Sequence, residues 1–224
     1  RRQRQMCIRD RGGTGKSEIG DAAYGGSADN DNSGTLKYIR LENTGYALDS
    51  EHEANGISFY GVGNGTTVEY VQAYNGSDDG FEFFGGSVDV KHMVVTNCSD
   101  DSFDWTEGWN GRGQFLVAYQ EAKETLGFDC DCLMECDNNG KNFAATPVAC
   151  PTLANLTLIG NGGEKQGVRL RAGTQVKMYN ALISGKGKCL TTETTETEKA
   201  LVDGTSVLNY VTLATDIECN GAEE

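Results

Sequence analysis

The chain has 224 residues, with 30 glycines, two prolines and a formal net charge of −14. A surface this acidic repels phosphate groups, which argues against nucleic acid as a partner. No apolar run reaches the length that a membrane-spanning helix needs, so we predict no transmembrane segment.

Residues 1–11 differ in composition from the rest of the chain, since they contain five arginines and one aspartate. Residues 6–11 also match what one reading frame of a common sequencing-library adapter would encode. We interpret residues 1–11 as an artefact or a disordered basic arm and exclude them from the fold prediction. Residues 12–224 are predicted to form one domain, a fragment that lacks its N-terminal repeats.

A short pattern occurs twice in the middle of the chain. Residues 77–83 read SDDGFEF, and residues 99–105, which lie 22 positions later, read SDDSFDW. A strand-like run precedes each copy, at 67–71 and at 90–94. Self-similarity at such a period indicates a solenoid of stacked repeats, which we call rungs.

Each rung is predicted to contain two short strands. The first strand is expected at 35–41, 67–73, 90–96, 114–119, 153–159, 176–183 and 207–213, and the second at 56–59, 81–83, 103–105, 128–130 and 168–170. The first strands align at Tyr38, Tyr70, His92, Phe115, Asn155, Asn180 and Tyr210, at intervals of 32, 22, 23, 40, 25 and 30 residues. The basic rung is therefore about 22 residues long.

The longer intervals are explained by inserted loops at 49–55, 131–150 and 191–203. The threonine- and glutamate-rich tract at 191–198 is predicted to be a solvated loop. Short strands without helical periodicity predict an all-β fold, a parallel β-helix.

The alternation within the second strands predicts two inward columns and one outward column. The inward columns are Ile57, Phe81, Phe103, Phe128 and Val168, and Phe59, Phe83, Trp105, Cys130 and Leu170. The outward column between them is Ser58, Glu82, Asp104, Asp129 and Arg169. Three carboxylates would thus stack at the inter-strand spacing of about 4.8 Å.

The turns add Asp78, Asp79, Asp100 and Asp101 to this outward column of acids. Like charges this close raise each other's pKa or bind a cation, and hard oxygen ligands suit Ca²⁺. We predict a candidate Ca²⁺ site at Asp79, Asp101 and Asp104. The alternative is a solvated acidic face whose aspartates serve as turn formers.

The same carboxylates fit an enzyme. Retaining glycoside hydrolysis uses two carboxyl groups about 5 Å apart, a distance that Glu82 with Asp104, or Asp104 with Asp129, could meet. Trp109, in the following loop, is a candidate stacking platform for a sugar ring.

Several segments resemble a known family. They are DNSGTLKYIR at 31–40, GVGNGTTVEYVQ at 61–72, DDGFEFFGG at 78–86, DDSFDW at 100–105, and ATP at 145–147 with PTLAN at 151–155. These segments are similar to bacterial surface proteins, usually described as lipoproteins or exported proteins, with a right-handed parallel β-helix of pectate-lyase-like fold. The resemblance covers most of residues 25–190. It implies an exported protein of a Gram-negative bacterium, at the outer-membrane surface or extracellular, and implies no activity.

Known β-helix pectinases combine an Asp-Asp step with a Gly-His-Gly and an Arg-x-Lys. Asp100 with Asp101, and Arg169 with Arg171, weakly resemble two of these motifs, but no Gly-His-Gly occurs in the chain. An exported location favours disulfides, and we predict the pairs Cys136–Cys150 and Cys189–Cys219. A zinc site at Cys130, Cys132, Cys136 and Cys150 is the alternative, although it lacks the usual paired spacing.

The first functional hypothesis is a non-catalytic surface protein whose acidic face binds a polysaccharide or a surface protein, assisted by Ca²⁺. Its candidate binding residues are Asp78, Asp79, Asp100, Asp101, Trp109, Arg169 and Arg171. The alternatives are a polysaccharide lyase or glycoside hydrolase that uses Glu82, Asp104 and Asp129, and a structural stalk of a larger envelope protein.

Overall fold

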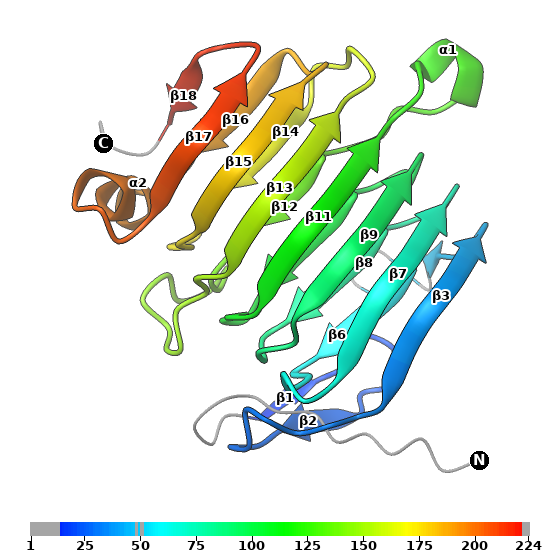
Figure 1. Cartoon of the computed structure of the whole chain (residues 1–224), viewed down its shortest axis with the longest axis vertical. Coiled ribbons are helices and arrows are strands. Elements are labelled where there is room, and N and C mark those ends of the chain that lie inside the picture. The colour runs from blue at the N-terminus through cyan, green and yellow to red at the C-terminus, as the bar shows by residue number, and fades with distance from the viewer. Residues whose placement is uncertain (1–13, 48, 50–51, 221–224) are drawn as a thin grey trace.

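The computed structural model describes residues 14–47, 49 and 52–220, so the predicted arm at 1–11 lies outside the described residues. The chain coils through two seven-stranded sheets in which every neighbouring pair is parallel. This arrangement confirms the predicted parallel β-helix (Figure 1).

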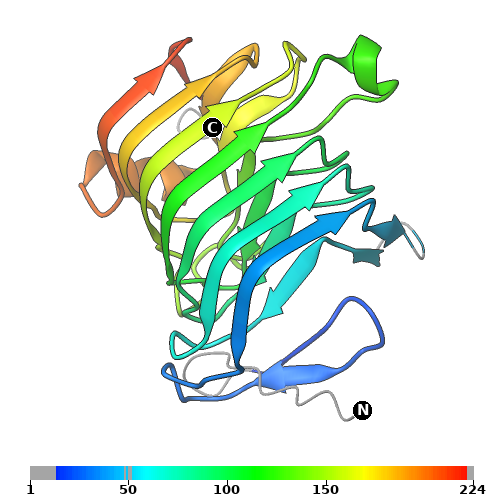
Figure 2. The ribbon, with the colours of Figure 1, turned by 45° about the vertical axis from the view of Figure 1, so that its right-hand side comes forward.

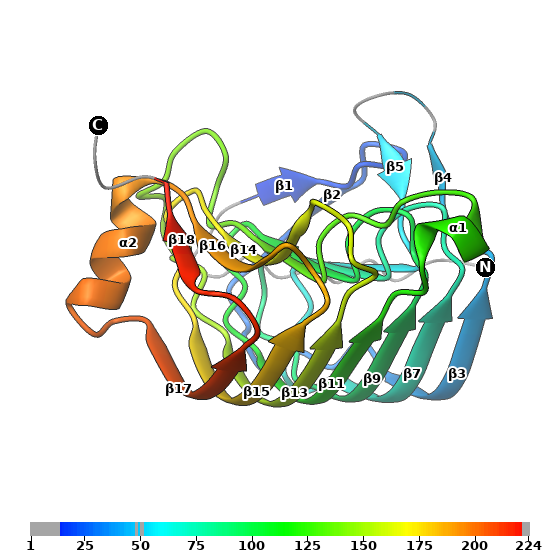
Figure 3. The ribbon, with the colours of Figure 1, turned by 90° about the horizontal axis from the view of Figure 1, so that it is seen from above.

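The long-strand sheet contains β3 (Thr35–Glu42), β7 (Thr67–Tyr74), β9 (Val90–Thr96), β11 (Arg112–Tyr119), β13 (Thr152–Ile159), β15 (Lys177–Ser184) and β17 (Val207–Leu213). The short-strand sheet contains β6 (Ile57–Tyr60), β8 (Phe81–Phe84), β10 (Phe103–Thr106), β12 (Met134–Cys136), β14 (Gln166–Leu170), β16 (Lys188–Thr192) and β18 (Ile217–Cys219). Figure 3 shows the long strands along one side of the molecule and the short strands behind them.

Every long strand bends at one residue in the left-handed backbone region (Figure 2). These residues have φ between 52° and 61°, and they are the seven aligned positions predicted from the sequence: Tyr38, Tyr70, His92, Phe115, Asn155, Asn180 and Tyr210. A non-glycine residue in this region costs about 1–2 kcal/mol. Contacts between rungs offset part of that cost. The rings of Tyr70 and His92 stack at 4.4 Å, for example, and Asn180 Nδ2 donates to Asn155 Oδ1 at 2.7 Å.

The core lies between the two sheets and contains both inward columns, with one correction to each. The observed columns are Ile57, Phe81, Phe103, Met134, Val168, Leu190 and Ile217, and Phe59, Phe83, Trp105, Cys136, Leu170, Thr192 and Cys219. Their last members, Ile217 and Cys219, lie in β18 at the end of the sheet and are exposed. The predicted members Phe128 and Cys130 are therefore wrong. They belong to an insertion that carries the short helix α1 (Lys123–Leu126), and β12 begins after it.

Two further predictions about the loops are wrong. The tract at 191–198 is not a solvated loop, because it contains the end of β16 and the start of α2 (Thr195–Val202). Thr192 and Glu198 are buried there, and the Thr192 hydroxyl donates to Glu198 Oε1 at 2.9 Å. The predicted loop at 131–150 contains β12.

Two small hairpins lie beside the β-helix. β1 (Thr14–Lys16) pairs with β2 (Ala23–Gly25), and β4 (Tyr46–Ala47) pairs with β5 (Glu53–Ala54). Of these strands, β5 lies within the predicted insertion at 49–55, and β4 lies just before it. The ring of Tyr24 in β2 lies 5.2 Å from that of Tyr60, so the first hairpin packs against the β6 end of the short-strand sheet. Within the described segments, we find no helix of sufficient length and apolar character to cross a bilayer.

The cysteines of the described residues are all free thiols, so neither predicted disulfide is formed. Cys136 is fully enclosed in its inward column. Cys219 pairs in register with Thr192, three residues beyond Cys189. Three residues along a strand span about 10 Å, which is more than the separation of about 6 Å that a disulfide allows.

Candidate functional site

The outward column of the short-strand sheet carries the predicted stack of acids, with one substitution. The in-register residues are Ser58, Glu82, Asp104, Glu135, Arg169, Thr191 and Glu218. The predicted place of Asp129 is therefore wrong, and Glu135 occupies that position. Asp129 lies in the insertion before β12, where it contacts Lys123 and Asn161.

Around this column lies a cavity of about 310 Å³, which we call the acidic trough. Its lining consists of ten acidic side chains, one amide and one guanidinium: Glu18, Glu53, Asp78, Asp79, Glu82, Asp100, Asp101, Asp104, Asp131, Glu135, Asn55 and Arg169. Of the predicted residues, Glu82, Asp104, Arg169 and the four turn aspartates all meet here. Sequence reasoning missed Glu18, Glu53, Asn55, Asp131 and Glu135.

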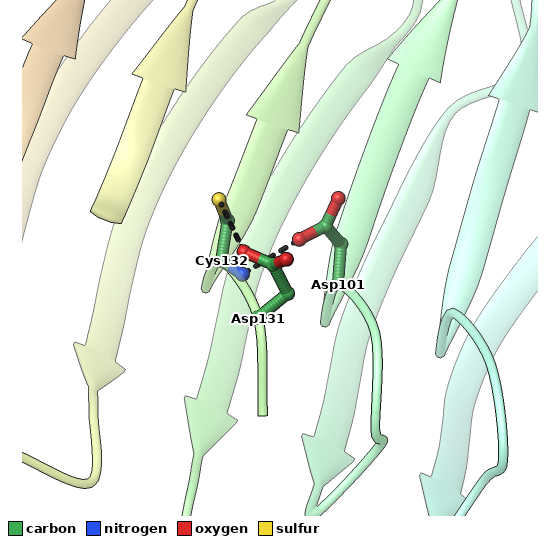
Figure 4. A group of neighbouring side chains, drawn as sticks. All are labelled: Asp101, Asp131 and Cys132. Atoms are coloured by element: carbon green, nitrogen blue, oxygen red, sulfur yellow. Dashed lines mark hydrogen bonds between the residues drawn. The ribbon is translucent and has the colours of Figure 1, made fainter. Parts of the chain in front are cut away.

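The turn aspartates line the trough and also stabilise the turns that carry them. Asp79 Oδ1 accepts the backbone N–H of Asp101 at 2.9 Å, and Asp101 Oδ1 accepts that of Cys132 at 2.6 Å. Figure 4 shows the second of these bonds, beside the Cys132 thiol that donates to Asp131 Oδ1 at 3.3 Å. The turn-forming role is thus real, but an ionised carboxylate has about four lone-pair positions. This role leaves capacity for a ligand.

The acids in the trough are held far from their ordinary protonation behaviour. Burial, together with the charges of Glu53 and Asp100, raises the pKa of Asp78 to about 6, and burial with Asp131 raises the pKa of Asp100 to about 6. Burial and neighbouring carboxylates raise the pKa values of the deeper acids well above their usual range; these are Asp79, Glu82, Asp101 and Asp104. At neutral pH the trough therefore retains protons unless a cation replaces them.

Carboxylate oxygens converge in several overlapping groups in which all ligand atoms lie within 4.8 Å of one another. The groups are Glu53, Asp78 and Asp100; Asp79, Asp100 and Asp101; Asp79, Glu82 and Asp104; and Asp101, Asp104 and Glu135. Each pair within the predicted trio Asp79, Asp101 and Asp104 occurs in one of these groups. The three residues thus lie in one neighbourhood, but no single group contains all of them, and a Ca²⁺ site at this trio stays a prediction.

Asp78 provides a separate indication of a ligand. Its side chain is 4% exposed, it lines the trough, and its Oδ2 atom is buried without a hydrogen-bond partner among the described residues. A buried carboxylate oxygen left in this state costs free energy unless an ion, a proton or water satisfies it. The all-oxygen groups of the trough fit a hard cation such as Ca²⁺.

A fifth group adds a thiol to two carboxylates: Asp101, Asp131 and Cys132 (Figure 4). Burial, followed by the charges of Asp101 and Asp131, raises the pKa of the Cys132 thiol far above its usual value. A metal binds the thiolate rather than the thiol. This group is therefore a poorer cation site than the all-oxygen groups.

Arginines close one end of the acidic surface. Arg169 Nη1 donates to Glu135 Oε1 at 2.9 Å, and its Nε donates to Glu193 at 2.8 Å. Arg171 Nε donates to Asp137 Oδ1 at 2.7 Å. Both predicted binding arginines are thus paired with acids of their own chain, which neutralise them.

Trp109 does not form the predicted sugar platform. The indole is 2% exposed, its ring stacks on Phe83 at 4.1 Å, and its Nε1 donates to the carbonyl of Val88 at 3.2 Å. Both its apolar face and its polar atom are therefore satisfied inside the core.

A family model described as a pectate-lyase like beta helix domain matches residues 5–223. No curated protein and no solved structure matches the chain. The matching description names a fold, so the activity has to be inferred from the acidic trough.

Proposed function

The chain belongs to the pectate-lyase-like beta helix family, and on that premise we propose that it is a binding protein that holds Ca²⁺ in the acidic trough. The observation that carries this proposal is the composition of the cavity. Ten of its twelve lining residues are acidic, and the buried Asp78 Oδ2 has no protein partner among the described residues.

The spacing of the oxygens is compatible with Ca²⁺. Ca²⁺ takes six to eight oxygen ligands at roughly 2.3–2.6 Å, so two ligands of one ion are at most about 5 Å apart. The carboxylate groups of the trough, with their atoms within 4.8 Å, satisfy this limit. Arg169 is the sole basic residue among the described residues that line the trough, and it is already paired with Glu135 and Glu193.

The cation determines which partner can bind. Without it, a trough of carboxylates repels any polyanion. A bound Ca²⁺ that keeps open coordination positions accepts carboxylates from a second molecule. The proposed partner is therefore an acidic polysaccharide, with an acidic surface protein as the alternative. The resemblance to exported proteins motivates a cell-surface location as part of the same proposal.

Calcium is expected to raise the thermal stability of the full chain. Binding to the folded state alone stabilises by about 2.7 kcal/mol when the free ion is 100-fold above Kd, which thermal melts in EDTA and in increasing CaCl₂ would measure. Asp79→Asn and Asp104→Asn are expected to remove most of this increment. Asp216→Asn, an exposed acid outside the trough, is the matched control and should keep it. An unchanged melting temperature at millimolar Ca²⁺ would exclude the site.

A second function is favoured by one observation. Glu82 and Asp104 are paired in register on adjacent strands and share a group of oxygens within 4.8 Å, close to the spacing of a retaining glycosidase. Burial raises the pKa of both groups, as a general acid requires.

Incubation of the protein with an acidic polysaccharide distinguishes Ca²⁺-dependent binding from catalysis. We expect Ca²⁺-dependent binding by sedimentation and no release of reducing ends or unsaturated sugars. Turnover that is lost in Asp104→Asn would instead assign the trough to a hydrolase or lyase.

A further inference from the structure

Outside the acidic trough, three polar side chains from three separate connections meet in one place. Asp129 comes from the insertion between β11 and β12, Asn161 from the connection after β13, and Lys186 from the turn between β15 and β16. Lys186 Nζ donates to Asn161 Oδ1 at 2.8 Å, and Asn161 Nδ2 donates to Asp129 Oδ1 at 2.8 Å. None of the three lines the trough.

Lys186 is unusually buried for a lysine, with 4% of its surface exposed. Its stem passes against Gly160, where a Cβ atom would come within 2.6 Å of Lys186 Cγ, so glycine makes room for it. Its Nζ atom also donates to the carbonyl of Cys130 at 3.0 Å, which fixes its direction. Burial lowers the pKa of Lys186, which enlarges the fraction of neutral, nucleophilic amine.

Asn161 is held as an electrophile. Its Oδ1 accepts the backbone N–H of Gly163 at 3.1 Å, so a donor separate from the attacking lysine points at the oxygen on which negative charge would develop. Its Nδ2, which would be the leaving group, is hydrogen-bonded to the carboxylate of Asp129. That carboxylate is thus in direct contact with the leaving group, where it can deliver a proton to it.

We propose that Lys186 and Asn161 form an intramolecular isopeptide bond, with Asp129 transferring the proton. The Nζ lone pair attacks Asn161 Cγ, and the electrons of the C=O bond move to Oδ1. A proton passes from Nζ through Asp129 to Nδ2. The C=O bond then re-forms, the Cγ–Nδ2 bond breaks and ammonia leaves. The step is an amide exchange without net redox change, so it needs no oxidant, reductant or co-reactant.

The bond would join adjacent rungs, since β13 and β15 are neighbours in the long-strand sheet. It would also secure the insertion at Asp129 and Cys130, whose contacts with Lys186 precede the reaction. A covalent link between stacked rungs resists local opening at the place where an insertion interrupts the stack.

Intact-mass measurement of the purified full chain tests the proposal. The wild-type protein is expected to be lighter than its sequence mass by one ammonia, about 17 Da. After trypsin, the peptide that contains Asn161 should be recovered joined to the one that contains Lys186, without cleavage after Lys186. Lys186→Arg, which keeps the positive charge and hydrogen-bond donors, and Asn161→Ala should both have the full sequence mass.

Two controls separate the bond from other outcomes. Asn161 precedes Gly162, and cyclisation of an Asn-Gly pair to a succinimide also releases ammonia. A succinimide would persist in Lys186→Arg and would leave the lysine peptide free. Asp129→Asn should slow the loss of ammonia at an intact Lys186 and Asn161. A full-mass wild-type protein after prolonged incubation, or a mass loss that survives in Lys186→Arg, would overturn the proposal.

Discussion

Replacing Phe103 by alanine is expected to lower the free energy of unfolding by about 3–5 kcal/mol, the usual cost of removing a buried phenylalanine. Phe103 is 2% exposed and lies in an inward column between Phe81 and Met134. Because each rung packs mainly on its two neighbours, the cavity would weaken the contacts on both sides at once. Urea unfolding followed by tryptophan fluorescence measures the change.

Phe128→Ala is the matched control for this experiment. Phe128 is 36% exposed and lies just after α1, in the insertion between β11 and β12. Its truncation is expected to cost less than about 1 kcal/mol, as is typical of a surface site. Equal losses for the two variants would mean that Phe128, rather than Met134, continues the inward column.

Phe103 and Phe128 also show where the register predicted from the sequence was correct and where it was wrong. The FEF and FDW triplets are separated by 22 residues, so an apolar-acid-apolar pattern and the period agree on the same register. In the next rung two triplets compete, Phe-Asp-Cys at 128–130 and Met-Glu-Cys at 134–136. The period favours the first. The structure uses the second, because an insertion changes the spacing without changing which residues fit inside.

The acidic trough was predictable to the extent that it arises from register. Glu82, Asp104 and the turn aspartates follow from the repeat. Glu18 lies in the connection between β1 and β2, and Glu53 is the first residue of β5. No periodic pattern places these two hairpins beside the β-helix. The prediction of a sugar platform at Trp109 was wrong for a related reason. Its loop folds back so that the indole fills the core against Phe83. The alternation of apolar and polar residues within one strand cannot predict where a distant hairpin or loop packs.

The second large effect is an inverted dependence of stability on pH. In EDTA, the protein is expected to be more stable at pH 5 than at pH 7.5, by about 3 kcal/mol once the shifts of its half-buried acids are discounted for solvent screening. A one-unit change in pKa corresponds to about 1.4 kcal/mol, and the pKa of buried Asp78 rises from 3.8 to about 6. Asp100 changes in the same way, and the pKa of Glu18 rises from 4.5 to about 7, first through burial and then through Asp78.

The sign follows from proton binding. Between about pH 4 and pH 7 the folded state holds protons on these acids that the unfolded chain has released, so stability falls as pH rises. These acids contribute their full stabilisation at pH values below the pKa values of the unfolded chain. That stabilisation is lost as the pH rises through the pKa values of the folded protein. The pKa of Asp129 is lowered instead, mainly by its hydrogen bond from Asn161, so it titrates below this window.

Urea midpoints at a series of pH values in EDTA measure this slope, and Glu82→Gln provides the variant. An uncharged isostere at Glu82 removes an acid that must take up a proton when the chain folds, so it should raise stability at pH 7.5 and flatten the slope. Saturating Ca²⁺ should flatten it as well, because the ion replaces the protons. A protein that loses stability steadily on acidification from pH 7.5 to 5 would show that the trough acids are paired rather than repelling. In that case neither protons nor a cation would be needed to hold them together.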